Sequence, residues 1–223
     1  MKKKNIKLII LIVLSLSVLG GRLLFSNIES DYISSDNNKA VQVVNDNIPT
    51  FTKKDKSTLS YPGYEYYSAL DSLGRCGYAE ACVGFETMPT NKRESISKVK
   101  PTGWMNNKYD FIEGGWLYNR CHLIAFCLTG ENANDHNLIT GTRFMNVEGM
   151  LPYEIKIQNY IEETDNHVMY RVEPDFKDDN MLASGVHMMA QSVEDNTISF
   201  NVYCPNIQPG VKINYSSGDN YDE

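Results

Sequence analysis

An arginine and a histidine stand two residues apart in the segment Asn119-Arg120-Cys121-His122. Side chains two apart on a β-strand point to the same face, so a strand here would place Arg120 beside His122. A neutral imidazole can take a proton from water at about pH 7, and a guanidinium can make two hydrogen bonds to a phosphate. The spacing predicts a phosphate clamp next to a general base, although such a pair is more often a solvated surface.

A second polar set further along the chain favours the chemical interpretation. Arg143 and Asn146 lie within Thr142-Arg143-Phe144-Met145-Asn146, and Glu154 follows at the start of a predicted helix. Arg143 is a second candidate for binding phosphate, with a structural salt bridge as an equally good interpretation.

Two strands and a helix are predicted to position these residues. Residues 116–126 are aromatic and apolar around the polar cluster, which indicates a strand, and a loop over 129–136 leads to a second strand over 137–142. Residues 151–163 change to a helical period that places Leu151, Ile155 and Ile161 near one face, with Pro152 in the first turn.

The rest of the chain predicts mainly strands. They are expected at residues 167–171, 182–192, 198–204 and 211–215, separated by turns rich in Asp and Asn. We therefore expect an α+β fold, in which an antiparallel sheet is joined to a strand–loop–strand–helix unit that carries the polar cluster.

In these motifs the sequence resembles the DNA/RNA non-specific endonuclease family, in its secreted, streptodornase-like branch. That family has a ββα-metal, or His-Me finger, core in which an Asp/Asn-Arg-Gly-His motif is followed by a strand, an Asn and a Glu. The resemblance covers most of residues 61–215. It also includes the segments Met88-Pro89-Thr90-Asn91-Lys92-Arg93, Pro101-Thr102-Gly103-Trp104 and Leu128-Thr129-Gly130-Glu131-Asn132.

The resemblance implies a role for each matched residue. His122 would be the general base, Asn146 the one direct protein ligand to Mg²⁺, and Glu154 an acid that orients the metal's waters. Arg120 would contact the phosphate. Mg²⁺, with Mn²⁺ as an alternative, keeps most of its water shell and offsets charge on the departing oxygen. The expected activity is hydrolysis of phosphodiester bonds in DNA, and in RNA, to 5′-phosphate products.

Two positions depart from the family motif. Asn119 stands where many members have Asp, so it can hydrogen-bond but cannot orient an imidazole by charge; we assign it to substrate binding. Cys121 stands where Gly or another small residue is usual, which raises the question of a positive φ at this position. We expect the thiol to be tolerated structurally, and its place beside His122 suggests sensitivity to oxidation.

The net charge of the chain argues against a nucleic-acid partner, whereas the charge of one segment argues in favour of such a partner. The formal net charge is −7, and residues 1–22 carry five positive charges and no acids, so the remainder stands at −12. Residues 91–108, however, hold five cations against a single acid, together with Trp104. Lys98 and Lys100 of this strip are candidates for following a phosphate backbone, and a solvated loop is an equally good interpretation.

The N-terminus predicts export. Four lysines precede an apolar run that begins at Leu8, which is typical of a signal peptide or an uncleaved membrane anchor over residues 1–25. Residues 26–60 are rich in Asn, Asp, Ser and Lys and predict a flexible linker before an endonuclease domain over 61–223. We expect a secreted or surface-anchored monomer, with membrane contact only through an uncleaved N-terminal segment.

The cysteines and the other histidines are assigned no catalytic role. The five cysteines are an odd number; Cys76 with Cys82, and Cys121 with Cys127, could each close a local disulfide, but spacing does not fix the pairing. A zinc site at Cys121, His122 and Cys127 lacks the usual ligand spacing. His136, His167 and His187 are interpreted as structural or surface residues.

Two other functions are consistent with parts of the sequence. One is a catalytically inactive surface binding module with the nuclease fold; joint presence of His122, Asn146 and Glu154 argues against it, because binding alone needs none of them. The other is a thiol hydrolase, disfavoured because adjacent Cys121 and His122 would point to opposite faces of a strand.

Overall fold

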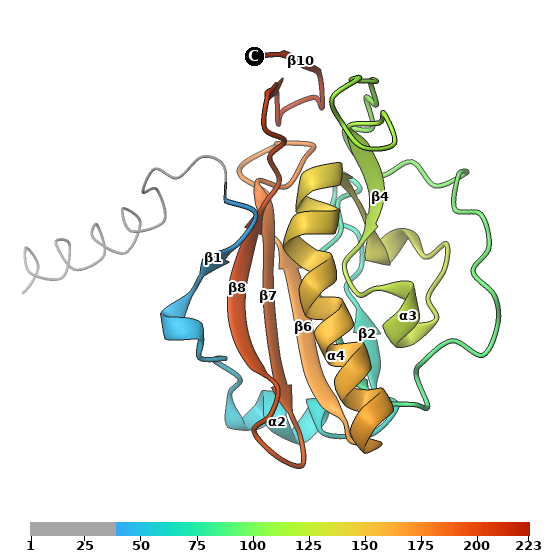
Figure 1. Cartoon of the computed structure of the whole chain (residues 1–223), viewed down its shortest axis with the longest axis vertical. Helices are drawn as coiled ribbons and strands as arrows, with labels where there is room; N and C mark the ends of the chain where they lie inside the picture. Colours follow the sequence, from blue (N-terminus) through green and yellow to red (C-terminus); the bar gives the residue numbers. More distant parts are fainter. Residues whose placement is uncertain (1–38) are drawn as a thin grey trace, which may run out of the picture. The chain divides into compact units, whose positions relative to one another are not determined.

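The computed structural model describes residues 39–223, and a six-stranded antiparallel sheet forms its centre (Figure 1). The strands lie in the order β1-β8-β7-β6-β3-β2. Their bounds are β1 Gln42–Val43, β2 Glu65–Tyr67, β3 Ala79–Val83, β6 Val168–Pro174, β7 Gly185–Ser192 and β8 Ser199–Pro205. The three strands predicted over 167–171, 182–192 and 198–204 are thus confirmed as three successive neighbours, β6, β7 and β8.

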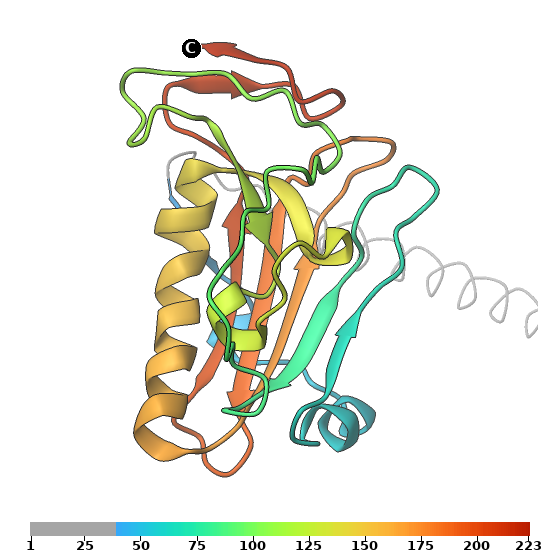
Figure 2. The same cartoon turned by 90° about the vertical axis from the view of Figure 1, so that its right-hand side faces the viewer.

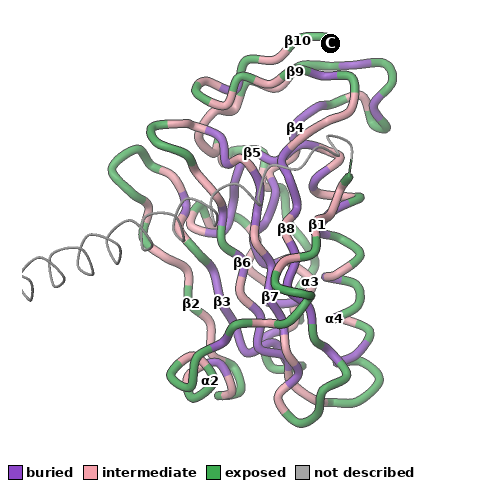
Figure 3. Tube along the Cα trace, turned by 90° about the vertical axis from the view of Figure 1, so that its left-hand side faces the viewer, coloured by how far each residue is buried: buried purple, intermediate pink, exposed green. Residues whose placement is uncertain are grey.

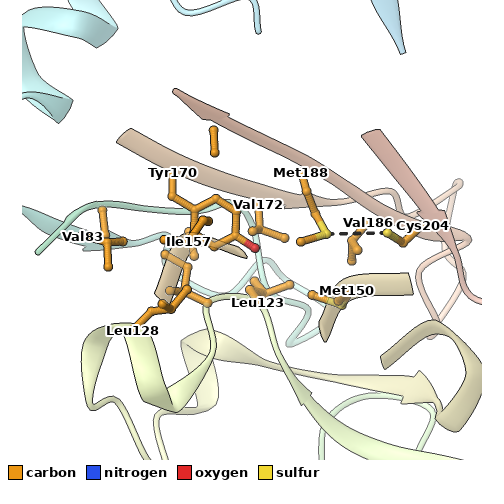
Figure 4. Close-up of a cluster of buried hydrophobic side chains, with 14 of the residues drawn as sticks. Val83, Leu123, Leu128, Met150, Ile157, Tyr170, Val172, Val186, Met188 and Cys204 are labelled. Atoms are coloured by element: carbon orange, nitrogen blue, oxygen red, sulfur yellow. Dashed lines mark hydrogen bonds between the residues drawn. The ribbon is translucent and has the colours of Figure 1, made fainter. Parts of the chain in front are cut away.

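Helix α4, Leu151–Thr164, covers one face of this sheet (Figure 1). Its buried residues are Glu154, Ile157, Tyr160 and Ile161, whereas Leu151 and Ile155 are exposed. The predicted helix is confirmed, but its predicted apolar face was wrong for Leu151 and Ile155. Ile157 and Ile161 direct the burial, because they join the main cluster of buried apolar side chains, where Ile157 lies close to Tyr170 (Figure 4).

A second, two-stranded sheet carries the polar motif. β4, Tyr118–His122, pairs antiparallel with β5, Leu138–Thr142, in a register that places His122 opposite Leu138. The connection holds a short helix, α3, Phe126–Thr129, and a 3₁₀ turn, η2, Asp135–Asn137. After β5 the chain forms a π-helical segment, η3, Met145–Met150, that continues directly into α4. This is the predicted strand–loop–strand–helix unit, and the whole fold is α+β.

The described part of the predicted linker is folded. Residues 39–60 contain β1, a 3₁₀ turn η1, Asn45–Asn47, and helix α2, Lys53–Leu59. Leu59 is fully buried, with Phe51, against two methionines of β6 and β7. Over residues 39–60 the structure therefore differs from the predicted linker, because a few apolar residues widely spaced in a polar segment are enough to attach it to the sheet. Figure 3 shows α2 as a mainly exposed helix at the end of the buried strands.

The C-terminal residues form a hairpin beside the segment that precedes β4 (Figure 2). β9, Val211–Ile213, pairs with β10, Asn220–Asp222, so the strand predicted over 211–215 is shorter than expected. Tyr109, Leu117 and Tyr118 share a buried apolar cluster with Val211, and Asn220 Oδ1 accepts a hydrogen bond of 2.8 Å from the Tyr109 hydroxyl. The hairpin thus fixes the segment that leads into the polar motif.

The predicted signal peptide or anchor over residues 1–25 lies outside the described residues. Among residues 39–223, no helix has the length and apolar character needed to cross a membrane.

Candidate active site

Residues from all parts of the polar motif line one cleft of about 1080 Å³. Arg120 and His122, two apart on β4, both face it, as their spacing predicted. Asn119 of the same strand, Asn146 of η3 and Glu154 of α4 line it too. The structure therefore brings together the residues that the sequence named as base, metal ligand and outer acid.

His122 is held by one ring nitrogen. The side chain is buried, and Nε2 lies 2.8 Å from the main-chain oxygen of Asn132, in the loop between α3 and η2. A carbonyl oxygen only accepts, so Nε2 carries the proton, and in the neutral ring Nδ1 keeps a free lone pair. Burial lowers the pKa of His122 below 6.5, and the nearby charge of Arg93 lowers it further. The imidazole is therefore neutral at about pH 7 and has one nitrogen able to accept a proton.

Asn146 lies in the first turn of η3, and its amide is in contact with Cys121. The thiol of Cys121 lies 3.0 Å from Asn146 Oδ1 and 3.4 Å from the Met150 sulfur. Asn146 is the residue of η3 that lines the cleft. π-Helical turns of this kind are frequent at functional sites. The contact orients the amide, because the thiol can donate a hydrogen to Oδ1 and not to the amide nitrogen.

The backbone at Cys121, where the family motif usually has Gly, does not need the positive φ that a glycine would allow. Cys121 is an ordinary strand residue, opposite Ile139 in the β4–β5 ladder, and it has no positive φ. Its side chain is 1% exposed, and burial raises its pKa well above the usual range of a thiol. A thiol that is buried and protonated reacts poorly with oxidants, so the structure argues against the suggested sensitivity to oxidation.

Glu154 is a buried carboxyl without a hydrogen-bonding or ion-pair partner among residues 39–223. It is 5% exposed, and no hydrogen bond or ion pair within the described residues engages it. Burial raises its pKa to about 8, while the charge of Arg93 acts in the opposite direction. A carboxyl in this environment favours the arrival of a cation, which would compensate its charge.

The two predicted arginines of the site are engaged with protein groups. The Arg120 guanidinium donates to the main-chain oxygens of Ser97, at 2.8 Å, and Val99, and it lies 4.2 Å from the centre of the Trp104 ring. Arg143 pairs with Glu113 at 3.1 Å, and its Nε is buried without a partner. Arg120 thus supports the loop that carries the basic strip, and Arg143 makes the salt bridge that the sequence offered as an alternative.

Arg93 was not named as a site residue from the sequence, yet it lines the cleft. It is exposed, its charge acts on both His122 and Glu154, and no hydrogen bond or ion pair in the described part of the chain engages it. The only signal in the sequence was its place in the basic strip and in the segment Met88–Arg93. Lys98 and Lys100 are exposed on either side of Val99, outside the cleft lining.

Among the other cysteines and histidines of the described residues, Cys127 lines the cleft and the rest lie outside its lining. All five cysteines are free thiols; the Cys76 thiol, for example, donates to the main-chain oxygen of Leu138. None of His136, His167 and His187 lines the cleft. In residues 39–223 no group of three or more His, Cys, Asp or Glu side chains is arranged to hold a metal ion.

Comparison with known proteins identifies the class of this fold and site. Residues 53–194 match the family model described as DNA/RNA non-specific endonuclease, and the chain belongs to this family. It is an endonuclease whose substrate is nucleic acid.

Solved structures of nucleases share the fold. NucA from Streptococcus agalactiae, with magnesium ion bound, is 23% identical, with 82% of this chain and 87% of that chain covered and a TM-score of 0.67. The Sda1 nuclease, with bound zinc ion, is 28% identical over 72% of this chain and 81% of its own, with a TM-score of 0.65. A protein described as an extracellular endonuclease is 17% identical, covering 85% and 100%, with a TM-score of 0.56.

Proposed function

We propose that this chain hydrolyses phosphodiester bonds of DNA and RNA to 5′-phosphate products, with magnesium as its cofactor and His122 as its general base. The observation that carries the proposal is the state of His122: it is buried and lines the cleft, and its Nε2 donates to the Asn132 carbonyl, so the neutral ring has its lone pair on Nδ1.

The reaction begins with proton transfer from water to Nδ1 of His122. The water oxygen forms a bond to phosphorus while the bond from phosphorus to the 3′-oxygen breaks. The 3′-oxygen takes a proton from solvent water and leaves as a hydroxyl group, the proton held on Nδ1 of His122 returns to solvent, and the phosphate remains on the 5′ side. A lowered pKa serves this role, because the ring is already neutral when water binds.

The residues present fit a divalent cation. Asn146 offers an amide oxygen, and Glu154 offers a buried carboxyl whose raised pKa a cation would lower. Oxygen donors of this kind suit Mg²⁺, with Mn²⁺ as an alternative, and Glu154 would hydrogen-bond to the waters of the ion. When bound, the cation would stabilise negative charge on the phosphate and on the departing oxygen. The NucA structure with magnesium ion bound and the Sda1 structure with bound zinc ion support a divalent ion.

Several cations would bind the substrate's phosphates. Arg93 has an unpaired guanidinium at the cleft, which makes it the best placed to reach a phosphate beside His122. Arg120 and Arg143 would act at the same cleft, with Asn119 as a hydrogen-bonding neighbour, and Lys98 and Lys100 would attract the strand from outside it. Contacts to phosphate carry no sequence information, which accounts for cleavage without sequence preference.

We also propose that the enzyme acts outside the cell. The basic and apolar N-terminus over residues 1–25 supports a signal peptide or anchor, with a tether from residue 26 to the start of the described fold and the nuclease domain after it. The structural relative described as an extracellular endonuclease is consistent with this location. The enzyme would act as a monomer.

The test of this function is cleavage of plasmid DNA and of RNA by the purified chain, with Mg²⁺ or with EDTA, alongside Asn146→Ala and Asn159→Ala. Asn159 lies on α4 away from the cleft and is the matched control. We expect cleavage that EDTA and Asn146→Ala abolish, that Asn159→Ala preserves, and that leaves 5′-phosphate ends. Absence of cleavage under every condition would favour the inactive binding module, and cleavage blocked by thiol alkylation but not by EDTA would favour a thiol hydrolase.

A further inference from the structure

The chain has two tryptophans, and both line the catalytic cleft, but in different states. Trp104 is covered by the Arg120 guanidinium and packs against the buried cluster that includes Tyr109. Trp116 is 46% exposed, and among residues 39–223 it belongs to none of the clusters of buried apolar side chains. The fold therefore gains little from Trp116, while a large aromatic ring faces the cleft.

Trp116 is exposed on a segment that is firmly held. It forms an antiparallel bridge with Lys108, and its neighbours are fixed by main-chain hydrogen bonds from Tyr109 to Gly115, at 2.9 Å, and from Leu117 to Asn107, at 3.1 Å. Leu117 is fully buried. Because the backbone on both sides is attached to the core, little backbone freedom is lost when the indole binds a partner.

Positive charge lies next to this ring. Lys108 Nζ is 4.8 Å from the centre of the Trp116 ring. Arg143 follows in the same part of the cleft, since its main-chain nitrogen donates to the oxygen of Leu117 at 2.7 Å, and its buried Nε has no partner. An aromatic face beside cations is the arrangement by which proteins hold unpaired nucleotides without reading their sequence.

From this arrangement we infer that Trp116 forms a subsite that stacks one unpaired base of the substrate strand, while Lys108 and Arg143 bind the adjoining phosphates. The inference rests on the proposed function, in that the strand being cleaved occupies the cleft. A base inside a duplex is already stacked on its neighbours, so the subsite favours single strands or duplexes that are locally unpaired. Every base has an aromatic face, so the subsite adds affinity without sequence preference.

The test compares two oligonucleotides of equal length that differ only in their bases: thymidine in one, abasic spacers in the other. Binding to His122→Ala in Mg²⁺ is measured by the intrinsic fluorescence of the two tryptophans and by anisotropy of a labelled strand. We expect the thymidine strand to bind about tenfold more tightly than the abasic strand and to quench the fluorescence, since stacking adds affinity only where a base is present.

Variants assign this difference to one side chain. In the same background, Trp116→Ala should bring the two affinities together, and Trp116→Phe should keep most of the difference while the quenching disappears. Phe111→Ala is the matched control, because Phe111 is an exposed aromatic residue on the same segment, outside the cleft lining, and should change nothing.

Two results would overturn the subsite: equal affinity for the two strands, including no binding of either, or a difference that survives Trp116→Ala. Either can occur while the wild-type chain still cleaves plasmid, so this failure is distinct from failure of the proposed function. A chain that discriminates between the strands but does not cleave would refute the activity and leave the subsite standing.

Discussion

At the scale of single residues, His122 shows how burial prepares a base. Only the neutral ring accepts a proton, and both burial and the charge of Arg93 lower the pKa. We predict that kcat/KM rises with pH along a limb whose midpoint lies below the ordinary value of 6.5. Arg93→Gln should move the limb to higher pH, because it removes a positive charge that disfavours the imidazolium. A midpoint above the ordinary value would contradict this description of the site.

Cys121 is one of the two positions that depart from the family motif, and its contact with Asn146 gives it a measurable role. We predict that Cys121→Ala weakens Mg²⁺ binding by about tenfold, as is typical when a partner of a metal ligand is removed, and that Cys121→Ser weakens it less because serine keeps a donor. Calorimetry in the absence of DNA measures this directly.

The measurement separates orientation of Asn146 from packing. Thermal unfolding in EDTA reports only the packing lost when the buried Cys121 side chain is changed, because no metal ion is bound under that condition. Equal Mg²⁺ affinities in all three proteins would remove the role assigned to the thiol. Activity should be the same after peroxide as after reductant, since the thiol is both buried and protonated.

At the scale of elements, the sequence predicted those whose own residues carry the signal. The helix over 151–163 and the strands β6 to β8 follow from apolar periodicity, and Pro152 marks the helix start. β3 was missed, because Ala79-Glu80-Ala81-Cys82-Val83 has a single β-branched residue and becomes a strand only between β2 and β6, where small side chains fit. Likewise, the residues of α4 that are buried are those that pack against the main cluster of buried apolar side chains, which the sequence of the helix does not determine.

The site shows the same division. Arg120, His122, Asn146 and Glu154 could be placed together because their order along the chain matches a known motif. The partners of Arg120 are main-chain oxygens of residues 97 and 99. No residue among 39–223 forms a hydrogen bond or an ion pair with Arg93. Contacts between segments that are distant in sequence have no local signal, so these two assignments required the structure.

Helix α2 provides a test of the folded state of residues 39–60. Thr52 accepts a hydrogen bond from the Asp55 nitrogen, and the Asp55 carboxylate accepts one from the Thr52 nitrogen, a reciprocal cap. We predict that Thr52→Ala lowers the free energy of unfolding by about 1 kcal/mol. Thr90→Ala, at an exposed loop threonine, is the control. If urea unfolding shows no loss for Thr52→Ala, residues 39–60 do not contribute to the fold.

At the scale of the whole molecule, one histidine links stability to pH. His167 contacts Glu194 at 2.6 Å and Glu86 at 3.4 Å. Burial opposes its charged form, but the two carboxylates raise its pKa above 6.5, while hydrogen bonds from His167 lower the pKa of Glu194 against the effect of burial. The histidine's contribution is therefore complete below its unfolded pKa and lost as pH rises through the raised value, and that of Glu194 is lost as pH falls through its lowered value.

The pH dependence of this contribution is measured by comparing the free energies of unfolding of the wild-type chain and of His167→Asn. We predict that His167→Asn costs more free energy of unfolding at about pH 5.5 than at about pH 8.5, because only the charged imidazole is stabilised by the carboxylates. Urea unfolding at the two pH values measures it. A cost that is equal at both would show that the ion pairs are screened by solvent.

The negative net charge of the molecule affects how strongly it attracts its substrate. A chain that stands at −12 beyond residue 22 repels nucleic acid overall, so attraction depends on Mg²⁺ and on exposed cations such as Lys98 and Lys100. We predict that Lys98→Ala with Lys100→Ala raises KM more than it lowers kcat. Lys212→Ala, at an exposed lysine of β9, is the control. The reverse pattern in steady-state kinetics would place the two lysines at the chemical step.

Activation of water by His122 is tested most directly by the rate of DNA cleavage by His122→Ala at saturating Mg²⁺. Circular dichroism would first confirm that the variant is folded, since His122 is buried. We predict a fall in kcat of about 10²- to 10⁴-fold, the contribution of a general base, with Mg²⁺ affinity retained. Cleavage at the wild-type rate by His122→Ala would contradict it.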